Sequence, residues 1–245
     1  MKIVDDLIES EHSRLDATQH TGVQFTGFST SWQAVARYHT FLTLIVEREA
    51  KATDNFSLAA KALRDTTPSS GPYLTAEQER RLNELDKATD LLHLEIESFY
   101  LFAKILLDAV ARAIEKYFGQ GKACSLDSHH DLIDNFAEYV AQKKLDIPTD
   151  FVERARRVRG DISNFRDHEI AHNKRLNRVT ATALTQDGRR ATIIATSTVV
   201  PPERMKPQAS SIHVAELMSA VESYIASAIE IVKTNTDKRN LTFTS

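Results

Sequence analysis

The feature that most constrains the fold is a long helical pattern that begins near Thr75. Apolar residues recur at three- and four-residue steps from Leu82 to Tyr117, which is the spacing of a helix that buries one face. Between Phe99 and Ala103 the sequence is apolar almost all round, so we expect this stretch to be buried on several sides. The pattern predicts the central helix of a helical bundle.

Both ends of this helix carry recognisable boundary signals. Thr75 and Gln78 form a capping-box pattern, in which each side chain accepts a hydrogen bond from the other residue's backbone N–H. Gly119 and Gly121 lie where the helix should end, because glycine readily adopts the left-handed conformation of a helix C-cap. Upstream, the Pro-, Ser- and Gly-containing stretch 66–72 marks a break in the chain.

Helical periodicity also predicts shorter elements on both sides of the central helix. They are residues 1–16, a helix opening near Ser29–Ser31 after a polar stretch with Gly22 and Gly27, a short helix capped by Asp127–Ser128, a helix from Phe151 to about Asn173 with Gly160 as its weak position, and a last helix from Val214 to Val232.

One β-hairpin is expected before the last helix. β-Branched residues in 179–183 and 191–196 flank Asp187-Gly188, and an Asp-Gly turn between such runs is a strong hairpin signal. We therefore expect a mainly α fold, a helical bundle with one β-hairpin inserted before the last helix. The whole chain, residues 1–245, is expected to form a single helical domain.

Composition and charge exclude several classes of protein. The chain is 42% hydrophobic and 27% charged, which is typical of a globular protein, and its net charge of −3 argues against nucleic-acid binding through overall charge. Cys124 is the single cysteine, so an internal disulfide is excluded. Asp5 and Asp6 stand where a signal peptide needs apolar residues, and no segment is long and apolar enough to span a membrane. We expect a cytoplasmic protein with no membrane partner.

Two motifs overlap in the stretch 164–175. The first, His168-Glu169-Ile170-Ala171-His172, has the H-E-x-x-H pattern of zinc hydrolases, in which two histidines four apart reach one metal ion. Charged residues flank it on both sides, and cations beside a Zn²⁺ ion are electrostatically unfavourable. We therefore expect no metal, and a zinc hydrolase is the most distant of the functions considered.

The second motif is Arg166 followed by His172 at an R-x5-H spacing, with the polar Asp167 directly after the arginine. The stretch 165–173 resembles the R-D-x-x-x-A-H segment of abortive-infection proteins of the HEPN superfamily, with a spacing one residue longer. The preceding long helix, with its segments 97–100 and 104–108, is also similar, as is the order of motif helix, hairpin and last helix. The resemblance covers about residues 85–235, and the helices in residues 1–65 have no assigned role.

This resemblance implies a HEPN-like helical bundle and a metal-independent endoribonuclease, or an abortive-infection toxin that acts on RNA without a cofactor. A histidine near neutral pKa can exchange protons with ribose oxygens, and an arginine can hold a phosphate. On this basis the expected catalytic residues are Arg166, His172 and Asp167, and the expected binding residues are His168, Asn173, Lys174 and Arg175.

The resemblance also implies partners. Arg166 and His172 lie about 120° apart on a helical wheel, so one protomer does not form a compact catalytic pair. A homodimer that brings two motifs together across a cleft would resolve this, and an antitoxin is a further expected partner. The segment 142–178 has a net charge of +4, which favours either a phosphate-facing surface or an ion-paired helix face around Arg154–Arg159.

Three alternatives remain open from the sequence. The chain could be a non-catalytic HEPN domain that binds nucleotide, nucleic acid or a partner protein. Cys124, His129 and His130 could hold a metal, although histidines before a helix more often cap it or face solvent. The central helix also carries the charged residues Glu95, Glu97, Lys104 and Asp108, which either point outward or pair with one another. Alternatively, Glu97 or Asp108 could lie behind Arg166 and orient its side chain.

Overall fold

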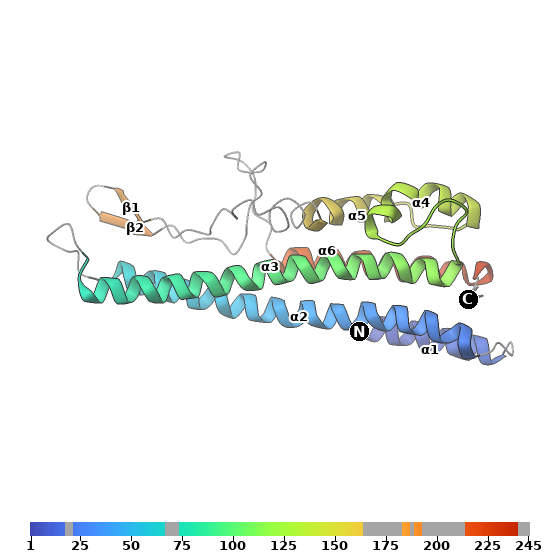
Figure 1. Ribbon diagram of the computed structural model, residues 1–245, viewed down its shortest axis with the longest axis horizontal. Helices are drawn as coiled ribbons and strands as arrows, with labels where there is room; N and C mark the ends of the chain where they lie inside the picture. Colours follow the sequence, from blue (N-terminus) through green and yellow to red (C-terminus); the bar gives the residue numbers. More distant parts are fainter. Residues whose placement is uncertain (18–21, 67–73, 164–182, 187–188, 193–213, 240–245) are drawn as a thin grey trace. The chain divides into compact units, whose positions relative to one another are not determined.

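The computed structural model describes residues 1–17, 22–66, 74–163, 183–186, 189–192 and 214–239, and these residues are mainly helical (Figure 1). This agrees with the predicted mainly α fold. The helices are α1 (Lys2–Ala17), α2 (Gly22–Arg64), α3 (Ala76–Phe118), α4 (His129–Lys143), α5 (Phe151–Val158) and α6 (Val214–Thr234), together with the π-helical turn η1 (Arg159–Ser163) and the 3-10 turn η4 (Thr236–Lys238).

Two short strands lie between η1 and α6 in the sequence. β1 (Ala183–Gln186) and β2 (Arg189–Thr192) pair antiparallel, with Ala183 opposite Thr192 and Gln186 opposite Arg189. The predicted Asp187-Gly188 turn lies outside the described residues, as do the predicted strand residues 179–182 and 193–196.

The described residues fall into two compact units, and both long helices contribute to both. Unit 1 takes its described residues from Met1–Thr43, Leu101–Asn164 and Leu217–Ser245. Unit 2 takes its described residues from Leu44–Tyr100 and Phe165–Glu216. The second half of α2 and the first half of α3 are therefore the helical part of unit 2.

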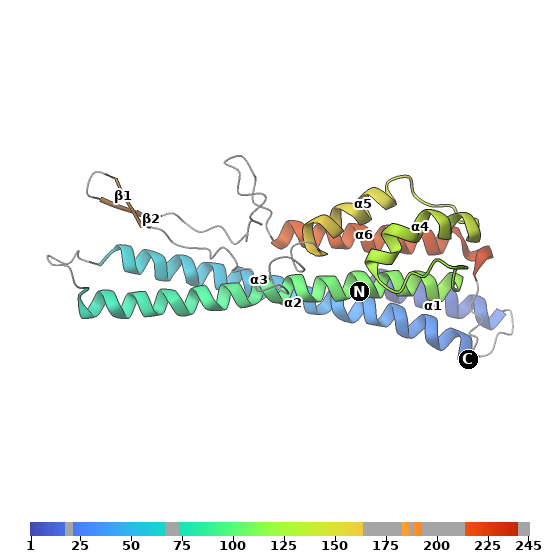
Figure 2. The ribbon, with the colours of Figure 1, turned by 45° about the horizontal axis from the view of Figure 1, so that its top comes forward.

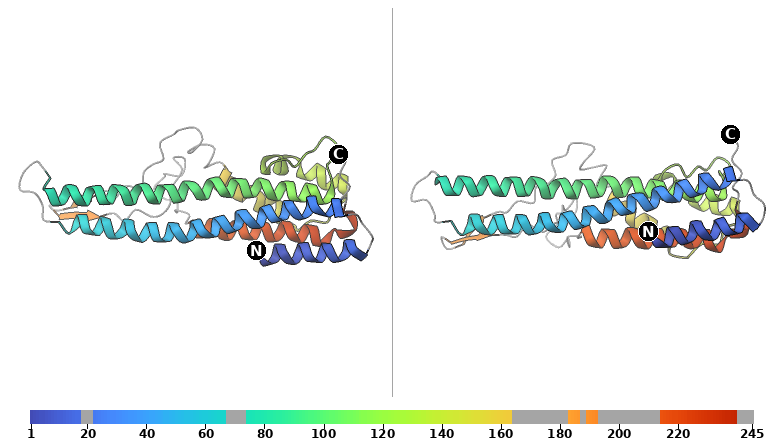
Figure 3. Two further views of the ribbon diagram at one scale, coloured as in Figure 1. Left: turned by 60° about the horizontal axis from the view of Figure 1, so that its bottom comes forward. Right: turned by 90° about the horizontal axis from the view of Figure 1, so that it is seen from below.

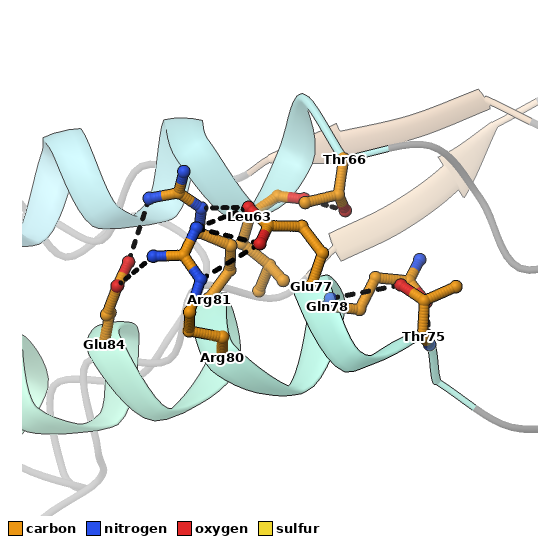
Figure 4. Close-up of polar contacts among 8 residues, drawn as sticks. All are labelled: Leu63, Thr66, Thr75, Glu77, Gln78, Arg80, Arg81 and Glu84. Carbon is orange, nitrogen blue, oxygen red and sulfur yellow. Dashed lines mark hydrogen bonds and ion pairs between the residues drawn. The ribbon is translucent and has the colours of Figure 1, made fainter.

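The start and end of α3 follow the predicted signals. The Thr75 N–H donates to Gln78 Oε1 at 2.9 Å, and the Gln78 N–H donates to Thr75 Oγ1 at 3.2 Å, so the capping box is confirmed (Figure 4). The helix ends at Phe118, and Gly119 follows with a φ of 77°, in the left-handed region that glycine tolerates.

The start of α2 differs from the prediction. The helix begins at Gly22 rather than near Ser29–Ser31, so Gly22 and Gly27 are helical residues. Ser31 does not cap the helix, because its hydroxyl donates to the carbonyl oxygen of Gly27 at 2.9 Å, one turn back. The burial of Phe28 explains the correction: its ring packs 5.3 Å from that of Tyr117, and this tertiary contact favours helix despite the glycines.

Unit 1 is built around an aromatic core. Phe151 of α5 lies between Phe136 of α4 and Tyr224 of α6, with ring centroids 4.9 and 5.6 Å apart respectively. These contacts place α4 and α5 against α6 (Figure 2). Trp32 is fully buried in the same unit. On α3, Leu101 is exposed, so the stretch 99–103 is not buried all round as its composition suggested.

Unit 2 has a simpler core between two helices. α2 and α3 lie side by side there (Figure 3). Each contributes one stripe of buried side chains at steps of three, four or seven residues. The apolar members of this seam are Ile45, Ala52, Phe56 and Ala60 of α2, with Leu85, Leu92, Ile96 and Phe99 of α3. Leu82, which the periodicity placed in the stripe, is exposed. Across the seam, Arg48 donates to the buried Glu95 at 2.6 Å.

Within the described part of the chain, none of the helices has a stretch apolar enough, over a sufficient length, to cross a membrane.

Candidate functional site

The residues predicted to act lie outside the described part of the chain. This applies to Arg166, Asp167 and His172, and equally to the expected binding residues His168, Asn173, Lys174 and Arg175. The end of the predicted helix 151–173 is therefore not described beyond Ser163. What the structure does give is the helical segment that leads into the motif and the polar side chains around that segment in unit 1.

The segment before the motif consists of α5 and the π-helical turn η1. Phe151, Ala155, Val158 and Ile162 are buried along it, which is the stripe that the sequence predicted. The backbone changes from α to π geometry at Arg159, one residue before the weak position that the sequence indicated. Such π turns occur frequently near functional sites, but a turn of this kind does not identify a ligand.

The arginines of this segment are mostly ion-paired. Arg154 Nε donates to Asp150 at 2.7 Å, and Arg154 also hydrogen-bonds Ser223 of α6. Arg159 lies 3.4 Å from Asp134 of α4. Arg157, which is largely exposed, lies 3.9 Å from Asp161.

The pairing of these three arginines fits the ion-paired alternative rather than an open phosphate-facing surface. Arg156 is exposed and forms no ion pair with a described residue, so it is the cation of α5 that remains available to an anion.

A group of polar side chains lies deeper in unit 1, between α3, α4 and α6. Lys104 Nζ donates to Asp108 Oδ1 at 2.7 Å, and the backbone N–H of His129 donates to the same oxygen at 2.8 Å. The expectation that Lys104 and Asp108 pair with each other is confirmed. The His129 ring packs edge-on against the ring of Tyr224, with centroids 5.2 Å apart.

The prediction that His129 caps α4 or faces solvent is wrong. Ser128 is the N-cap, and His129 is fully buried. Within the part of the chain that the structure describes, both of its ring nitrogens lack a hydrogen-bond partner. The signal was present in the spacing, because His129 is in phase with the buried residues Leu132, Phe136 and Tyr139 of α4.

Burial controls the protonation of this group. Desolvation of the His129 ring, followed by the charges of Lys104 and Arg159, lowers the pKa of His129 to about 3. Burial, with the nearby Asp108 carboxylate, raises the pKa of the Tyr224 hydroxyl well above its usual value. Both side chains are therefore neutral at physiological pH.

The other charged residues of α3 have separate roles. Glu95 neither points outward nor pairs with its neighbours on α3, because it is buried and bonded to Arg48 of α2. Glu97 is half-buried, and this burial raises its pKa above the ordinary value. Arg166, which Glu97 or Asp108 would orient, lies outside the described residues.

The described residues Cys124, His129 and His130 are not arranged as a metal site. His130 is exposed and lies 3.1 Å from Asp134, whereas Cys124 and His129 are buried. Burial also raises the pKa of the Cys124 thiol, which disfavours the thiolate that a metal would need. Across the described ranges, no three His, Cys, Asp or Glu residues are grouped so that they could hold a metal ion.

In comparisons with known proteins, no protein-family model, no curated protein and no solved structure matches the chain.

Proposed function

We propose that this chain is a HEPN-like protein and a metal-independent endoribonuclease of the abortive-infection or toxin type. The observation that carries the proposal is the spacing of Arg166 and His172 in the residues that directly follow α5 and η1. The mainly helical character of the described residues supports it, as does the presence of a further helix, α6, after the motif.

The proposed chemistry uses two side-chain types that suit RNA cleavage. His172 exchanges a proton with the ribose 2′-hydroxyl or with the leaving 5′-oxygen, because an imidazole titrates near neutral pH. Arg166 binds the scissile phosphate with two parallel hydrogen bonds and offsets the charge that develops on it. Asp167 completes the proposed catalytic set, and His168, Asn173, Lys174 and Arg175 are the proposed RNA-binding residues.

The proposed active form is a homodimer. Because Arg166 and His172 are separated by about 120° on a helical wheel, a compact site needs the motif of a second protomer. The helix that begins at Phe151 would contribute to that interface. Light scattering of the purified chain at micromolar concentration should give the mass of a dimer, and a stable monomer with full nuclease activity would contradict this arrangement.

The nuclease assay uses the purified full chain, a labelled RNA and an excess of a metal chelator. We expect cleavage that persists in the chelator and falls by about a hundredfold or more in Arg166→Ala and in His172→Ala. His130→Ala is the matched control, since this exposed histidine forms an ion pair with Asp134 and is not part of the proposed motif. Absence of cleavage by the wild-type chain, or full activity in both motif variants, would overturn the ribonuclease proposal.

A second candidate function is a non-catalytic HEPN domain that binds nucleotide, nucleic acid or a partner protein such as an antitoxin. The ion pairing of Arg154, Arg157 and Arg159 favours a partner protein as the ligand within this candidate. Cations that are engaged within the chain are less available to the phosphates of a nucleotide or nucleic acid. Retention of intact RNA by the wild-type chain, weakened by Lys174→Ala and Arg175→Ala, would select this function over cleavage. One zinc ion per chain, lost in His168→Ala, would instead indicate the zinc hydrolase.

A further inference from the structure

The His129 ring is fully buried, and neither of its nitrogens has a hydrogen-bond partner among the described residues. His129 is the first residue of α4, and its ring lies against Tyr224 of α6. The Tyr224 hydroxyl is also buried and has no hydrogen-bond partner in the described ranges. Buried polar atoms without partners are uncommon in folded proteins, and each one weakens the packing that holds it. The contact between α4 and α6 therefore depends on the state of this ring.

The charges around His129 come from two elements and are mostly positive. Lys104 and Asp108 lie on α3, and the charge of Arg159 on η1 also acts on the ring, whereas Tyr224 of α6, whose ring packs against that of His129, is uncharged. Asp108 is already bonded to Lys104, and it touches His129 through the backbone N–H rather than through the ring. A proton added to the ring would thus place a third cation in the group, with no carboxylate bonded to it.

We propose that His129 is an acid-sensitive switch, which allows α4 to stay packed against α3 and α6 only while its ring is neutral. When α4 opens locally, water reaches the ring and can stabilise the imidazolium. The closed arrangement gives no such stabilisation, because the ring is fully buried and the charges of Lys104 and Arg159 disfavour a further positive charge there. Acid therefore favours the open arrangement.

The sign and size of the effect follow from proton binding. In the closed state the pKa of His129 is about 3, whereas in a hydrated open state it returns to the ordinary value of 6.5. Below pH 6.5 the open state binds one more proton than the closed state, so the equilibrium constant for opening rises about tenfold per pH unit. Relative to neutral pH, we expect an increase of about tenfold at pH 5.5 and about a hundredfold at pH 4.5.

Cys124 provides a built-in probe for this opening. It is the single cysteine, it is buried in the segment just before α4, and its thiol should react only when this region opens. The rate of labelling of the full chain by dithiodipyridine, which reacts with thiols in acid, is divided by the rate for the urea-unfolded chain at each pH. This ratio removes the thiol's own titration and should rise by the factors given above.

Two variants isolate the histidine responsible. His129→Phe keeps an aromatic ring against Tyr224 and removes the titration, so its labelling ratio should not change between neutral pH and pH 4.5. His130→Ala removes the adjacent exposed histidine and should retain the full acid response. Equal acid responses in the wild-type chain and His129→Phe, or no response in the wild-type chain, would overturn the switch.

A measurement on the wild-type chain alone keeps the proposal testable if His129→Phe does not fold. The ring signals of His129 in an NMR titration of the folded protein should remain those of neutral imidazole down to about pH 4.5. Titration of His129 near its ordinary pKa of 6.5 in the folded chain would contradict the proposal. RNA cleavage does not enter either measurement, so a failure of the switch is distinct from a failure of the ribonuclease.

Discussion

Unit 1 and unit 2 share α2 and α3 but bury different kinds of side chain. Unit 1 buries large aromatic residues from several helices. Both units bury some polar side chains, such as Glu11 in unit 1 and Glu95 in unit 2. The helical part of unit 2 buries a narrow seam and leaves leucines such as Leu58, which is 66% exposed, in contact with solvent. Tertiary packing therefore contributes more to unit 1, and local helix terms contribute a larger share in unit 2.

The largest expected effect comes from truncating one buried phenylalanine in each unit. Phe151→Ala should lower the free energy of unfolding by about 4–5 kcal/mol, because rings from α4 and α6 hold the cavity open on both sides. Phe56→Ala should cost about 3 kcal/mol, since two helices can close over the space. Urea unfolding followed by Trp32 fluorescence and circular dichroism measures both. A greater loss at Phe56 would reverse the comparison.

A smaller effect is expected from the buried carboxylates. Glu11 accepts from the Tyr117 hydroxyl at 3.1 Å and from Arg14 at 3.1 Å, and Arg239 lies 3.6 Å away. Glu11→Gln should cost about 2–3 kcal/mol, because hydrogen bonds to a charged group are lost in a buried site. The control in unit 2, Glu95→Gln, should cost about 1 kcal/mol, as its partner is well exposed to solvent. Equal losses in urea unfolding would show that burial of the partner does not matter.

The same contrast explains which elements the sequence could predict. The start of α3 depends on Thr75 and Gln78, which lie three residues apart, so a local pattern was sufficient. The start of α2 depends on the packing of Phe28 against Tyr117, which is distant in the sequence. No local pattern can show such a contact, and the glycines near Phe28 therefore indicated a loop where the chain is helical.

The candidate site divides in a similar way. The spacing of Arg166 and His172 can be read from the sequence, but their surroundings depend on contacts outside the described residues. The burial of His129 was available in principle from its phase on α4. It was missed because a histidine directly after a capping serine is more often exposed. The ion pair of Arg159 with Asp134 joins two elements, so periodicity alone could not separate it from a phosphate-binding surface.

A capping substitution tests the local terms in unit 2. Thr75→Ala removes the hydroxyl that accepts from the Gln78 N–H and should lower the free energy of unfolding by about 1 kcal/mol. Ser128→Ala is the counterpart in unit 1, since Ser128 accepts from the Asp131 N–H at the start of α4. Hydrogen exchange should increase in the first turn of α3 for Thr75→Ala and of α4 for Ser128→Ala. An unchanged first turn in both variants would mean that packing alone fixes the helix starts.

The smallest effect is expected at the ion pairs near the start of α3, where Glu77 accepts from Arg80 at 2.7 Å and from Arg81 at 2.8 Å (Figure 4). These hydrogen bonds lower the pKa of Glu77, and the larger contribution comes from Arg80. The contribution to stability is therefore present above the ordinary carboxyl pKa of 4.5 and is lost as the pH falls through the lowered value. Glu77 and Arg80 are exposed to solvent and Arg81 is partly exposed, so dissolved salt screens the attraction.

Glu77→Gln should accordingly leave the urea midpoint unchanged within error at physiological ionic strength and reduce it slightly at low salt. Glu79→Gln is the matched control, because it removes the same charge from the same helical turn. A carboxylate at either position is stabilised by the positive end of the helix dipole. Glu79, unlike Glu77, forms no ion pair with a described residue. If both variants lose the same amount at low salt, the helix dipole accounts for the effect. A loss at Glu77 that persists in high salt would instead assign unit 2 a stabilising ion-pair network.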